Sequence, residues 1–361
     1  MRKFRAIPII LLWAVLTALA WFGGAEELSD SERRPLAQMP QLGANSILDG
    51  SFMADFEDYT LDQFPMRDSF RGIKSLFHSY VLGQRDNNGI YIADGYAVQM
   101  EYPLDMASVD HALERFSYLH EKYLEDSHVF MTIVPDKGYY LAQESGHLAM
   151  DYEKMFAAFR EGMPWAQQVD LTNVLSIDDY YRTDTHWRQE KLLDAAKVIC
   201  DALGVAGPVA EDYTQVALEK PFYGVYYGQA ALPVEAETLY YLESEQLKNC
   251  TVYDFESGKT GAVYDLAKAE GKDLYEIFLS GPRSLLTIEN PGGTPGKELI
   301  VFRDSFGSAM VPLLVSDYEK VTLVDIRYIQ TDVLERFLEF HGQDVLFLYS
   351  TLVLNNSETI K

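Results

Sequence analysis

Two short runs of apolar residues, each followed at once by polar residues, constrain the fold of this chain more than any other feature. Residues 128–134 lead into Pro135, Asp136 and Lys137, and residues 299–302 lead into Arg303, Asp304 and Ser305. Strands that are buried on both faces of a parallel sheet form continuous apolar runs, whereas half-exposed strands alternate apolar and polar residues. The two runs therefore predict a parallel sheet whose strands end in polar loops.

Strand-like and helix-like segments alternate around these two runs. Helices are predicted over 105–124, 150–162 and 331–340, and further strands over 168–171, 321–324 and 345–348. Alternation of this kind predicts a doubly wound α/β fold with a mainly parallel sheet, whose active groups gather beyond the carboxyl ends of the strands. Residues of about 204–297 break the alternation and are rich in Tyr and Gly, so they are predicted to form a large irregular or β-rich insertion.

The amino-terminal segment predicts export from the cytoplasm. Arg2, Lys3 and Arg5 precede an apolar stretch over 6–22. This pattern is typical of a signal peptide or a membrane anchor, and the basic residues before it place the rest of the chain outside. We therefore expect a signal or anchor over 1–25, a polar stalk over 26–50 and a catalytic domain over 51–361.

Charge and cysteine content narrow the function classes. The chain has 30 basic and 55 acidic residues, a net charge of −25, which disfavours nucleic acid as a partner. Neither Cys200 nor Cys250 has a second Cys or a His at metal-ligand spacing, so no metal or other cofactor is expected. Whether these two cysteines pair in a disulfide is left open.

Ser305 directly follows the second buried run and precedes a predicted helix. Its hydroxyl is therefore expected at the carboxyl edge of the sheet, beside backbone N–H groups that stabilise an oxyanion. The alternative is that Asp304 or Ser305 merely caps the helix.

His186 follows Asp184 by two residues, just before a predicted helix over 188–203. A serine nucleophile needs a base, and the base needs an anion that holds its tautomer and stabilises the imidazolium. This pattern favours His186 as the base and Asp184 as its partner. The alternative is that Asp184 or Thr185 caps the helix and that His186 is an ordinary surface histidine.

Together the two elements resemble a known pattern. Asp-x-His-Trp before a helix, followed by a strand, Asp-Ser, an aromatic residue and a helix, resembles the DHHW-type proteins and, more distantly, the alginate O-acetylation proteins. In that group the Asp-x-His pair precedes the serine, as it does here. Matches also occur at 134–137, 89–96 and 324–328. The resemblance implies an SGNH-hydrolase-like fold with flavodoxin-like layering and a catalytic triad of Ser305, His186 and Asp184.

Two residues depart from the family pattern. Thr185 stands where the DHHW name implies a second histidine, and Arg303 stands where a Gly-Asp-Ser sequence would have glycine. The second departure puts the oxyanion geometry in doubt.

Four further residues are candidates for binding. Lys137, Arg327 and Tyr328 stand just past predicted strands, where they could reach the site, although a role in a salt-bridged framework explains them at least as well. Gly281, within 278–282, is a candidate for an additional backbone N–H donor.

The resemblance implies transfer of an acetyl group to a hydroxyl of a cell-surface or secreted polysaccharide through an acyl-Ser305 intermediate. It also implies a glycan acceptor and a membrane-bound O-acyltransferase that supplies the acetyl group. Two alternatives stay open, namely a carbohydrate esterase with the same triad and a non-catalytic glycan-binding or assembly protein of the cell envelope. The acidic charge favours a neutral glycan.

Overall fold

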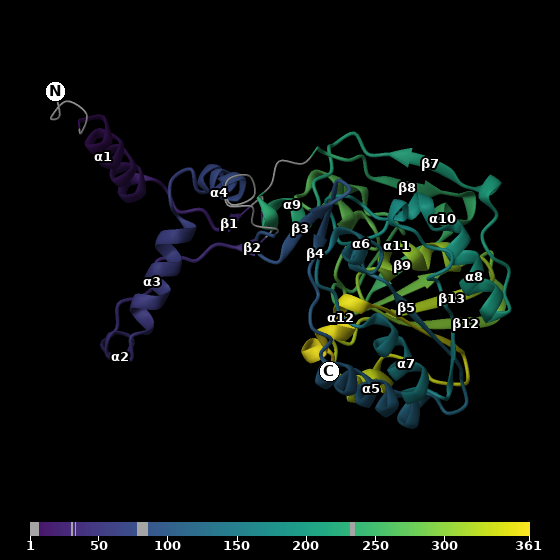
Figure 1. Cartoon of the computed structure of the whole chain (residues 1–361). Helices are drawn as coiled ribbons and strands as arrows, with labels where there is room; N and C mark the ends of the chain where they lie inside the picture. Colours follow the sequence, from purple (N-terminus) through teal and green to yellow (C-terminus); the bar gives the residue numbers. More distant parts are fainter. Residues whose placement is uncertain (1–6, 30–31, 33, 78–85, 232–234) are drawn as a thin grey trace. The chain divides into compact units, whose positions relative to one another are not determined.

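The chain divides into two compact units. A computed structural model describes residues 7–29, 32, 34–77, 86–231 and 235–361 (Figure 1). One unit comprises Met1–Ile90 and Tyr227–Val234, and the other comprises Tyr91–Tyr226 and Glu235–Lys361. We expected the catalytic domain to start at residue 51, whereas this division assigns 51–90 to the smaller unit.

The smaller unit is mainly helical. None of the helices among the described residues is both long enough and apolar enough to cross a membrane. The stalk expected over 26–50 makes specific contacts, because the Glu26 N–H donates to Gln63 Oε1 at 2.9 Å and Gln63 Nε2 donates to the Ala37 carbonyl at 3.0 Å. Its elements are α1 (Ile7–Phe22), α2 (Ala44–Leu48), α3 (Ser51–Asp62), α4 (Arg67–Leu76) and the antiparallel pair β1 (Leu28–Ser29) and β2 (Arg34–Pro35).

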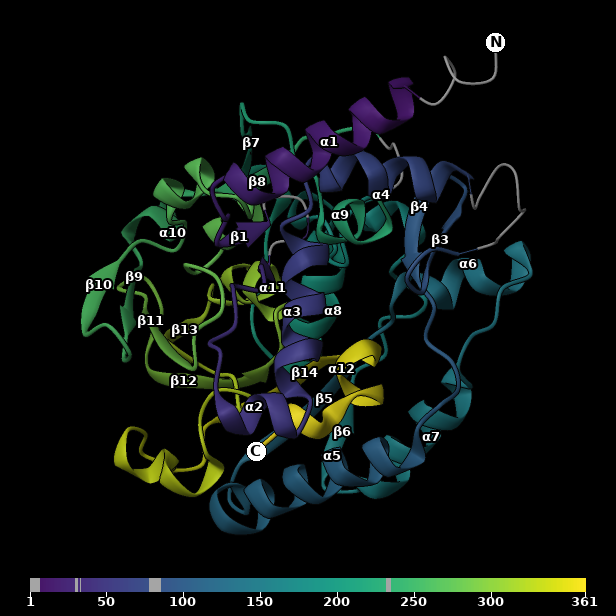
Figure 2. The ribbon, with the colours of Figure 1, turned by 90° about the vertical axis from the view of Figure 1, so that its left-hand side faces the viewer.

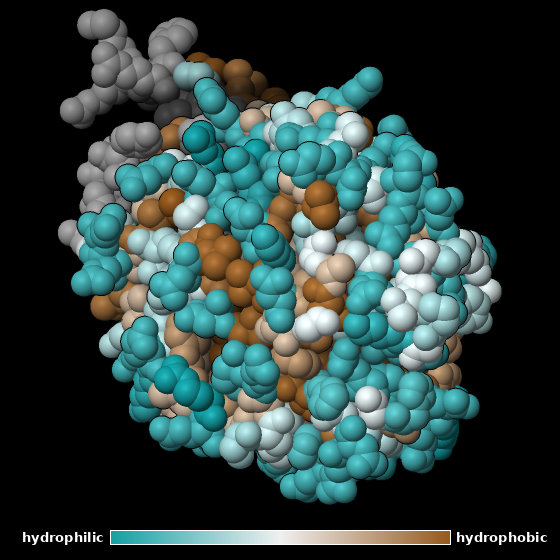
Figure 3. All heavy atoms as spheres, turned by 90° about the vertical axis from the view of Figure 1, so that its right-hand side faces the viewer, coloured by the Kyte–Doolittle hydropathy of each residue, from teal (hydrophilic) through white to brown (hydrophobic). Residues whose placement is uncertain are grey.

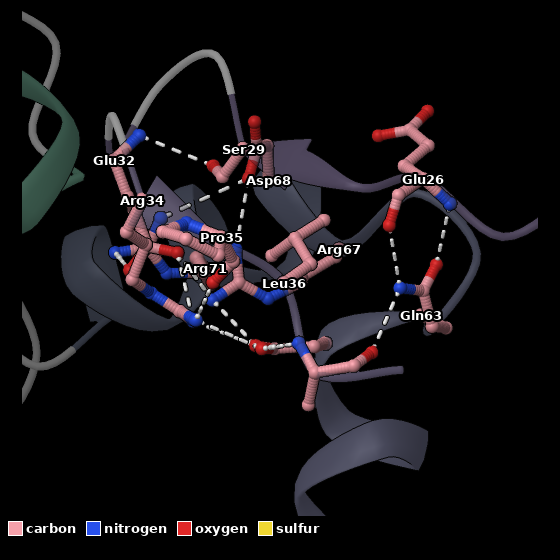
Figure 4. A network of polar contacts seen from close by, with 12 residues as sticks. Glu26, Ser29, Glu32, Arg34, Pro35, Leu36, Gln63, Arg67, Asp68 and Arg71 are labelled. Carbon is pink, nitrogen blue, oxygen red and sulfur yellow. Dashed lines mark hydrogen bonds and ion pairs between the residues drawn. The ribbon is translucent and has the colours of Figure 1, made fainter. Parts of the chain in front are cut away.

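Ion pairs join the strand pair of the smaller unit to its helices (Figure 4). Arg34 donates from both Nη atoms to the Asp62 carboxylate, at 2.8 and 2.6 Å. These hydrogen bonds hold the pKa of Asp62 at about 2. Arg71 Nη2 lies 2.9 Å from Glu32 Oε1. The network therefore fixes Glu32 and Arg34 against α3 and α4.

The larger unit is built on an eight-stranded sheet in the order β10-β9-β11-β13-β12-β14-β5-β6. Neighbouring strands from β13 to β6 are parallel, and those from β10 to β13 are antiparallel. The parallel strands are β13 (Tyr318–Val324), β12 (Thr294–Arg303), β14 (Asp344–Ser350), β5 (His128–Val134) and β6 (Ala166–Gln168), and the antiparallel edge is formed by β9 (Thr251–Asp254), β10 (Lys259–Gly261) and β11 (Leu285–Glu289).

Helices cover both faces of this sheet. Because alternate side chains of a strand point to opposite faces, Leu299 and Val301 of β12 join the core that contains α8 (Leu193–Leu203). Ile300 and Phe302 join the core that contains α5 (Met106–Leu119) and α7 (Tyr152–Gly162), which lie beside each other in Figure 2. The predicted doubly wound, mainly parallel α/β fold is confirmed.

The predicted insertion is rich in β-structure and belongs to the main sheet. Its strands β9, β10 and β11 form the antiparallel edge, and β11 pairs directly with β13. A separate antiparallel pair consists of β7 (Thr214–Ala217) and β8 (Tyr240–Glu243). The insertion thus extends the sheet that carries the site.

The remaining elements are short and mostly connect the sheet strands. The hairpin expected over 89–96 is present, with a turn at Asp94 and Gly95, whose φ angles of 48° and 80° suit a tight two-residue turn. The elements are β3 (Ile90–Ala93), β4 (Tyr96–Gln99), α6 (Lys137–Ser145), α9 (Val225–Ala230), α10 (Glu245–Asn249), α11 (Gly307–Met310) and α12 (Thr351–Asn355).

Candidate active site

Ser305 lies in the turn between β12 and α11. The turn is fixed by the buried carboxylate of Asp304, which accepts a hydrogen bond from the Phe306 N–H at 2.9 Å. The same carboxylate accepts from both the N–H and the hydroxyl of Ser350, each at 2.7 Å. Ser350 ends β14, the parallel neighbour of β12. A buried, fully hydrogen-bonded carboxylate rigidifies its surroundings, so two adjacent strands define the position of Ser305.

The backbone N–H groups that follow Ser305 are used within the turn. That of Phe306 donates to the Asp304 side chain, that of Gly307 to the Asp304 carbonyl at 3.1 Å, and that of Ser308 to the Ser305 carbonyl at 3.1 Å. We expected N–H groups of this turn to stabilise an oxyanion. Among residues 305–308, only the N–H of Ser305 itself is left for that role.

Asp184, His186 and Ser305 form one continuous hydrogen-bonded chain. The Nε2 atom of His186 lies 2.8 Å from Ser305 Oγ, and Nδ1 lies 2.6 Å from Asp184 Oδ1. The side chain of His186 is 12% exposed and that of Asp184 is 1% exposed. The structure thus brings the three predicted residues into contact, in the order nucleophile, base and carboxylate that acyl transfer requires.

The Asp184 carboxylate is oriented by two backbone N–H groups, one of which comes from the predicted insertion. The Val225 N–H donates to Asp184 Oδ2 at 2.8 Å, while the His186 N–H donates to Oδ1 at 3.1 Å. Gly224 makes this approach sterically feasible, because a Cβ at that position would overlap the Thr183 carbonyl oxygen and the Asp184 backbone. Only glycine fits there without a shift of one segment.

A second carboxylate holds the residues just before Asp184. Glu237 accepts hydrogen bonds from the Arg182 N–H at 2.9 Å, and from the Thr183 N–H and hydroxyl at 2.8 Å each. The Tyr226 hydroxyl lies 3.0 Å from the hydroxyl oxygen of Thr185. The loop that carries Asp184 and His186, here called the triad loop, is therefore clamped on both sides of Asp184.

An aromatic ring covers the imidazole of His186. The Tyr275 ring is stacked on it, with centroids 3.9 Å apart and an angle of 10° between the planes. Burial raises the pKa of Tyr275 well above its ordinary value. The ring limits the orientations of the imidazole, and its π face favours a cation above it.

Trp187 and Gln189, which follow His186, join the loop of the histidine to the turn that carries Ser305. Trp187 Nε1 donates to the Phe306 carbonyl at 3.0 Å, and Gln189 Nε2 donates to the Ala309 carbonyl at 2.9 Å. Both side chains are fully buried. These bonds fix the histidine loop relative to the nucleophile, although the two lie 119 residues apart in the chain.

The four candidates for binding lie in different settings. Lys137 is buried, and its Nζ donates to the Tyr181 carbonyl at 3.0 Å. Arg327 binds the buried Asp325 carboxylate through Nε and Nη2, at 2.8 and 2.6 Å, as expected of a framework residue. Tyr328 is 52% exposed.

Gly281 ends a run of three residues with positive φ. The angles are 54° at Leu279, 61° at Ser280 and 81° at Gly281. The Gly281 N–H donates to the Phe278 carbonyl at 3.2 Å. Its use as an oxyanion donor stays a prediction that requires this bond to open.

The two cysteines are not part of the site. Both are buried free thiols, so they do not form a disulfide. Burial raises the pKa of Cys200 to about 12 and that of Cys250 to about 11. Among the residues that the structure describes, no group of three or more His, Cys, Asp or Glu side chains is placed to hold a metal ion.

Sequence reasoning missed the residues that orient the triad. Gly224, Val225, Glu237 and Tyr275 all lie within the predicted insertion, where no motif marks them. Trp187 was part of the recognised Asp-x-His-Trp motif, but its link to the serine turn depends on the fold. The only signal in the sequence was the abundance of Gly and Tyr in the insertion.

Comparisons with known proteins find a family model and solved structures that are similar to this chain. The model of the DHHW protein family matches residues 174–324, a range that contains Asp184, His186 and Ser305. The resemblance to DHHW-type proteins is therefore confirmed. No curated protein matches the chain.

Three solved structures are similar to this chain to different extents. A DHHW family protein from Eubacterium siraeum is 23% identical, with a TM-score of 0.61 over 76% of this chain and 95% of that chain. Bacillus cereus PatB1 with a sulfonyl adduct is 17% identical, with a TM-score of 0.59 over 75% of this chain and 96% of that chain. The O-acetyltransferase domain of Pseudomonas putida AlgJ is 14% identical, with a TM-score of 0.40 over 74% of this chain and 92% of that chain. At these identities, the first two likenesses indicate a common fold.

Proposed function

We propose that this protein is an extracytoplasmic serine acyltransferase that O-acetylates a cell-surface or secreted polysaccharide. The observation that carries the proposal is the hydrogen-bonded chain from Ser305 Oγ through His186 to the buried Asp184 carboxylate. The resemblance to DHHW-type proteins supports acyl transfer over other uses of a serine nucleophile.

The first half-reaction acylates Ser305. His186 Nε2 takes the hydroxyl proton as Ser305 Oγ forms a bond to the carbonyl carbon of the acetyl donor. The tetrahedral oxyanion then collapses, the bond to the donor oxygen breaks, and the imidazolium returns the proton to that leaving oxygen. Asp184 keeps Nδ1 protonated and stabilises the imidazolium throughout.

The second half-reaction transfers the acetyl group to the glycan. A sugar hydroxyl attacks the acyl-serine carbonyl while His186 takes its proton. Collapse of the second intermediate breaks the bond to Ser305 Oγ, which regains a proton from His186. If water attacks instead of the sugar, the same residues act as an esterase, so exclusion of water decides the outcome.

The proposal places the reaction outside the cytoplasm. It rests on the basic residues and apolar stretch at the amino terminus, of which α1 (Ile7–Phe22) is helical. A membrane-bound O-acyltransferase is the proposed source of acetyl groups, with the amino-terminal segment as the contact with the membrane. The glycan acceptor is proposed to be neutral.

The decisive experiment measures acetyl release and nucleophile labelling. Wild-type protein is expected to cleave p-nitrophenyl acetate and to gain one sulfonyl group at Ser305 from phenylmethylsulfonyl fluoride, detected by peptide mass spectrometry. Ser305→Ala should lose both properties, whereas Ser257→Ala, which changes an exposed serine, should keep them. Full activity of Ser305→Ala would rule the proposal out.

Product analysis then separates the three functions. With a neutral oligosaccharide present, a transferase yields acetylated sugar, and an esterase yields acetate alone. A glycan-binding protein yields neither, and its Ser305 resists sulfonylation.

A further inference from the structure

Lys137 is a buried cation that contacts the loop of the triad. It is the first residue of α6, directly after the loop that ends β5, and it is 2% exposed. Its Nζ donates to the Tyr181 carbonyl at 3.0 Å and to the Arg182 carbonyl at 3.3 Å. It also lies 4.9 Å from the centroid of the Tyr226 ring. An ammonium group is removed from water only at considerable cost, so its presence here calls for a reason.

Three carboxylates act on this ammonium group, one from each element packed around it. Asp136 directly precedes Lys137, Asp184 belongs to the triad loop, and Glu237 belongs to the segment of the insertion that leads into β8. Burial lowers the pKa of Lys137 to about 7 despite these three negative charges. The lysine is therefore charged in weakly acidic solution and becomes neutral as the pH rises.

We propose that Lys137 is a positioning residue that holds the triad loop through two carbonyls and whose charge balances that of Asp184. This inference rests on the proposed function of Ser305, His186 and Asp184. Lys137 does not touch the substrate in this role. This role replaces the assignment of Lys137 to substrate binding, because Nζ donates to two backbone carbonyls and the side chain is covered.

The charge has a defined effect on proton transfer. A positive charge near the Asp184–His186 pair opposes protonation of the imidazole, which must be neutral to accept the serine proton. If the ammonium is replaced by a neutral group, the unbalanced Asp184 carboxylate favours the imidazolium. The acid limb of the plot of kcat/KM against pH, where activity falls as the imidazole becomes protonated, then moves to higher pH.

Two variants separate the charge from the hydrogen bonds. Lys137→Gln keeps an N–H donor for the loop carbonyls but removes the charge, and Lys137→Met removes both. Both variants should move the acid limb of kcat/KM for p-nitrophenyl acetate upward by about one pH unit. Lys137→Met should also lower kcat by roughly 10- to 100-fold with KM nearly unchanged, because the loop loses its anchor. Lys154→Met, on the exposed side of α7, serves as the control and should match the wild type.

The outcomes distinguish this inference from the proposed function. If Ser305→Ala is inactive but both Lys137 variants keep the wild-type acid limb, the charge of Lys137 plays no part and the inference fails alone. If Ser305→Ala is fully active, the proposed function fails, and the inference on Lys137 fails with it. Should Lys137→Met not fold, the acid limb of Lys137→Gln decides.

Stability provides a readout that does not depend on activity. Since the pKa of Lys137 falls from 10.5 to about 7 on folding, the unfolded chain binds a proton between these pH values that the folded chain has released. The free energy of unfolding should therefore rise with pH across this window, and the gain is fully lost once the pH has fallen to about 7. Urea denaturation between pH 6 and 9 should show this rise in wild type relative to Lys137→Gln. Identical pH dependence in the two proteins would show that the lysine is not buried as described.

Discussion

The imidazole of His186 is held at each of its polar atoms and on one face. Nδ1 contacts Asp184, Nε2 contacts Ser305, and the Tyr275 ring stacks at a centroid distance of 3.9 Å. The Tyr275 hydroxyl is buried and has no hydrogen-bond partner among the residues that the structure describes. We therefore expect the ring of Tyr275 to support the site and its hydroxyl to contribute little.

Two substitutions at Tyr275 test the separate contributions of its ring and its hydroxyl. Tyr275→Phe should keep activity and change the free energy of unfolding by less than about 1 kcal/mol, because the hydroxyl that it removes is unpaired. Tyr275→Ala should lower activity and destabilise the fold by about 3–5 kcal/mol, because it empties a buried ring site. Ester hydrolysis and urea denaturation measure the two effects. Equal loss of activity in both variants would instead assign a chemical role to the hydroxyl.

At the scale of elements, the contact between the 222–226 segment and the triad loop depends on Gly224. In Gly224→Ala the new methyl group would overlap the Thr183 carbonyl, so the segment must move and the Val225 N–H would leave Asp184. We expect kcat to fall by about 100-fold, as for other displacements of a catalytic group by about 1 Å.

The control for this substitution is Gly261→Ala on the edge strand β10. A Cβ there meets no atom within 4 Å, so activity should be unchanged. Kinetics with p-nitrophenyl acetate and circular dichroism melting curves check both variants. Wild-type kcat in Gly224→Ala would mean that the segment moves without disturbing Asp184.

The fold was largely predictable because its central strands are buried on both faces. β5 coincides with the run predicted at 128–134, and the run at 299–302 forms the end of β12. The predictions of helices, which have no such signal, were less accurate. The helix predicted over 331–340 is a 3-10 helix over Thr331–Arg336. The helix predicted over 188–203 is a 3-10 turn, Gln189–Lys191, followed by α8.

The contact among Ser305, His186 and Asp184 could be predicted only because these residues form short motifs at a strand end and before a helix. Their supports could not be predicted, since a backbone N–H such as that of Val225 has no signature in the sequence. The contact between Glu237 and the Thr183 N–H likewise joins positions 54 residues apart and exists only once the chain has folded.

At the scale of the whole molecule, the net charge of −25 acts on every ligand that approaches. Hydrophilic residues cover most of the rim of the face shown in Figure 3, and apolar atoms show through near its middle. An acidic protein of this kind repels polyanions over distances of about 10 Å at 0.1 M salt.

The charge predicts how acceptors respond to salt. The KM for an anionic oligosaccharide acceptor should fall as sodium chloride rises from 20 to 300 mM, because added ions screen the repulsion. The KM for a neutral oligosaccharide of the same length should stay constant. Initial rates of acetylated product measure both. An anionic acceptor whose KM rises with salt would indicate a local basic groove.

The path of the chain around Asp184 has a practical consequence for engineering. The chain passes into the smaller unit at Tyr227, shortly after Val225 donates to Asp184, and returns at Glu235, shortly before Glu237 accepts from Thr183. The detour is itself packed, because the Gly228 carbonyl accepts a hydrogen bond from Arg71 Nη2 at 2.9 Å and the Ala230 carbonyl accepts one from Asn87 Nδ2 at 2.7 Å. One residue added between Gly224 and Val225 would move the Val225 N–H away from Asp184, so a peptide tag belongs outside this segment.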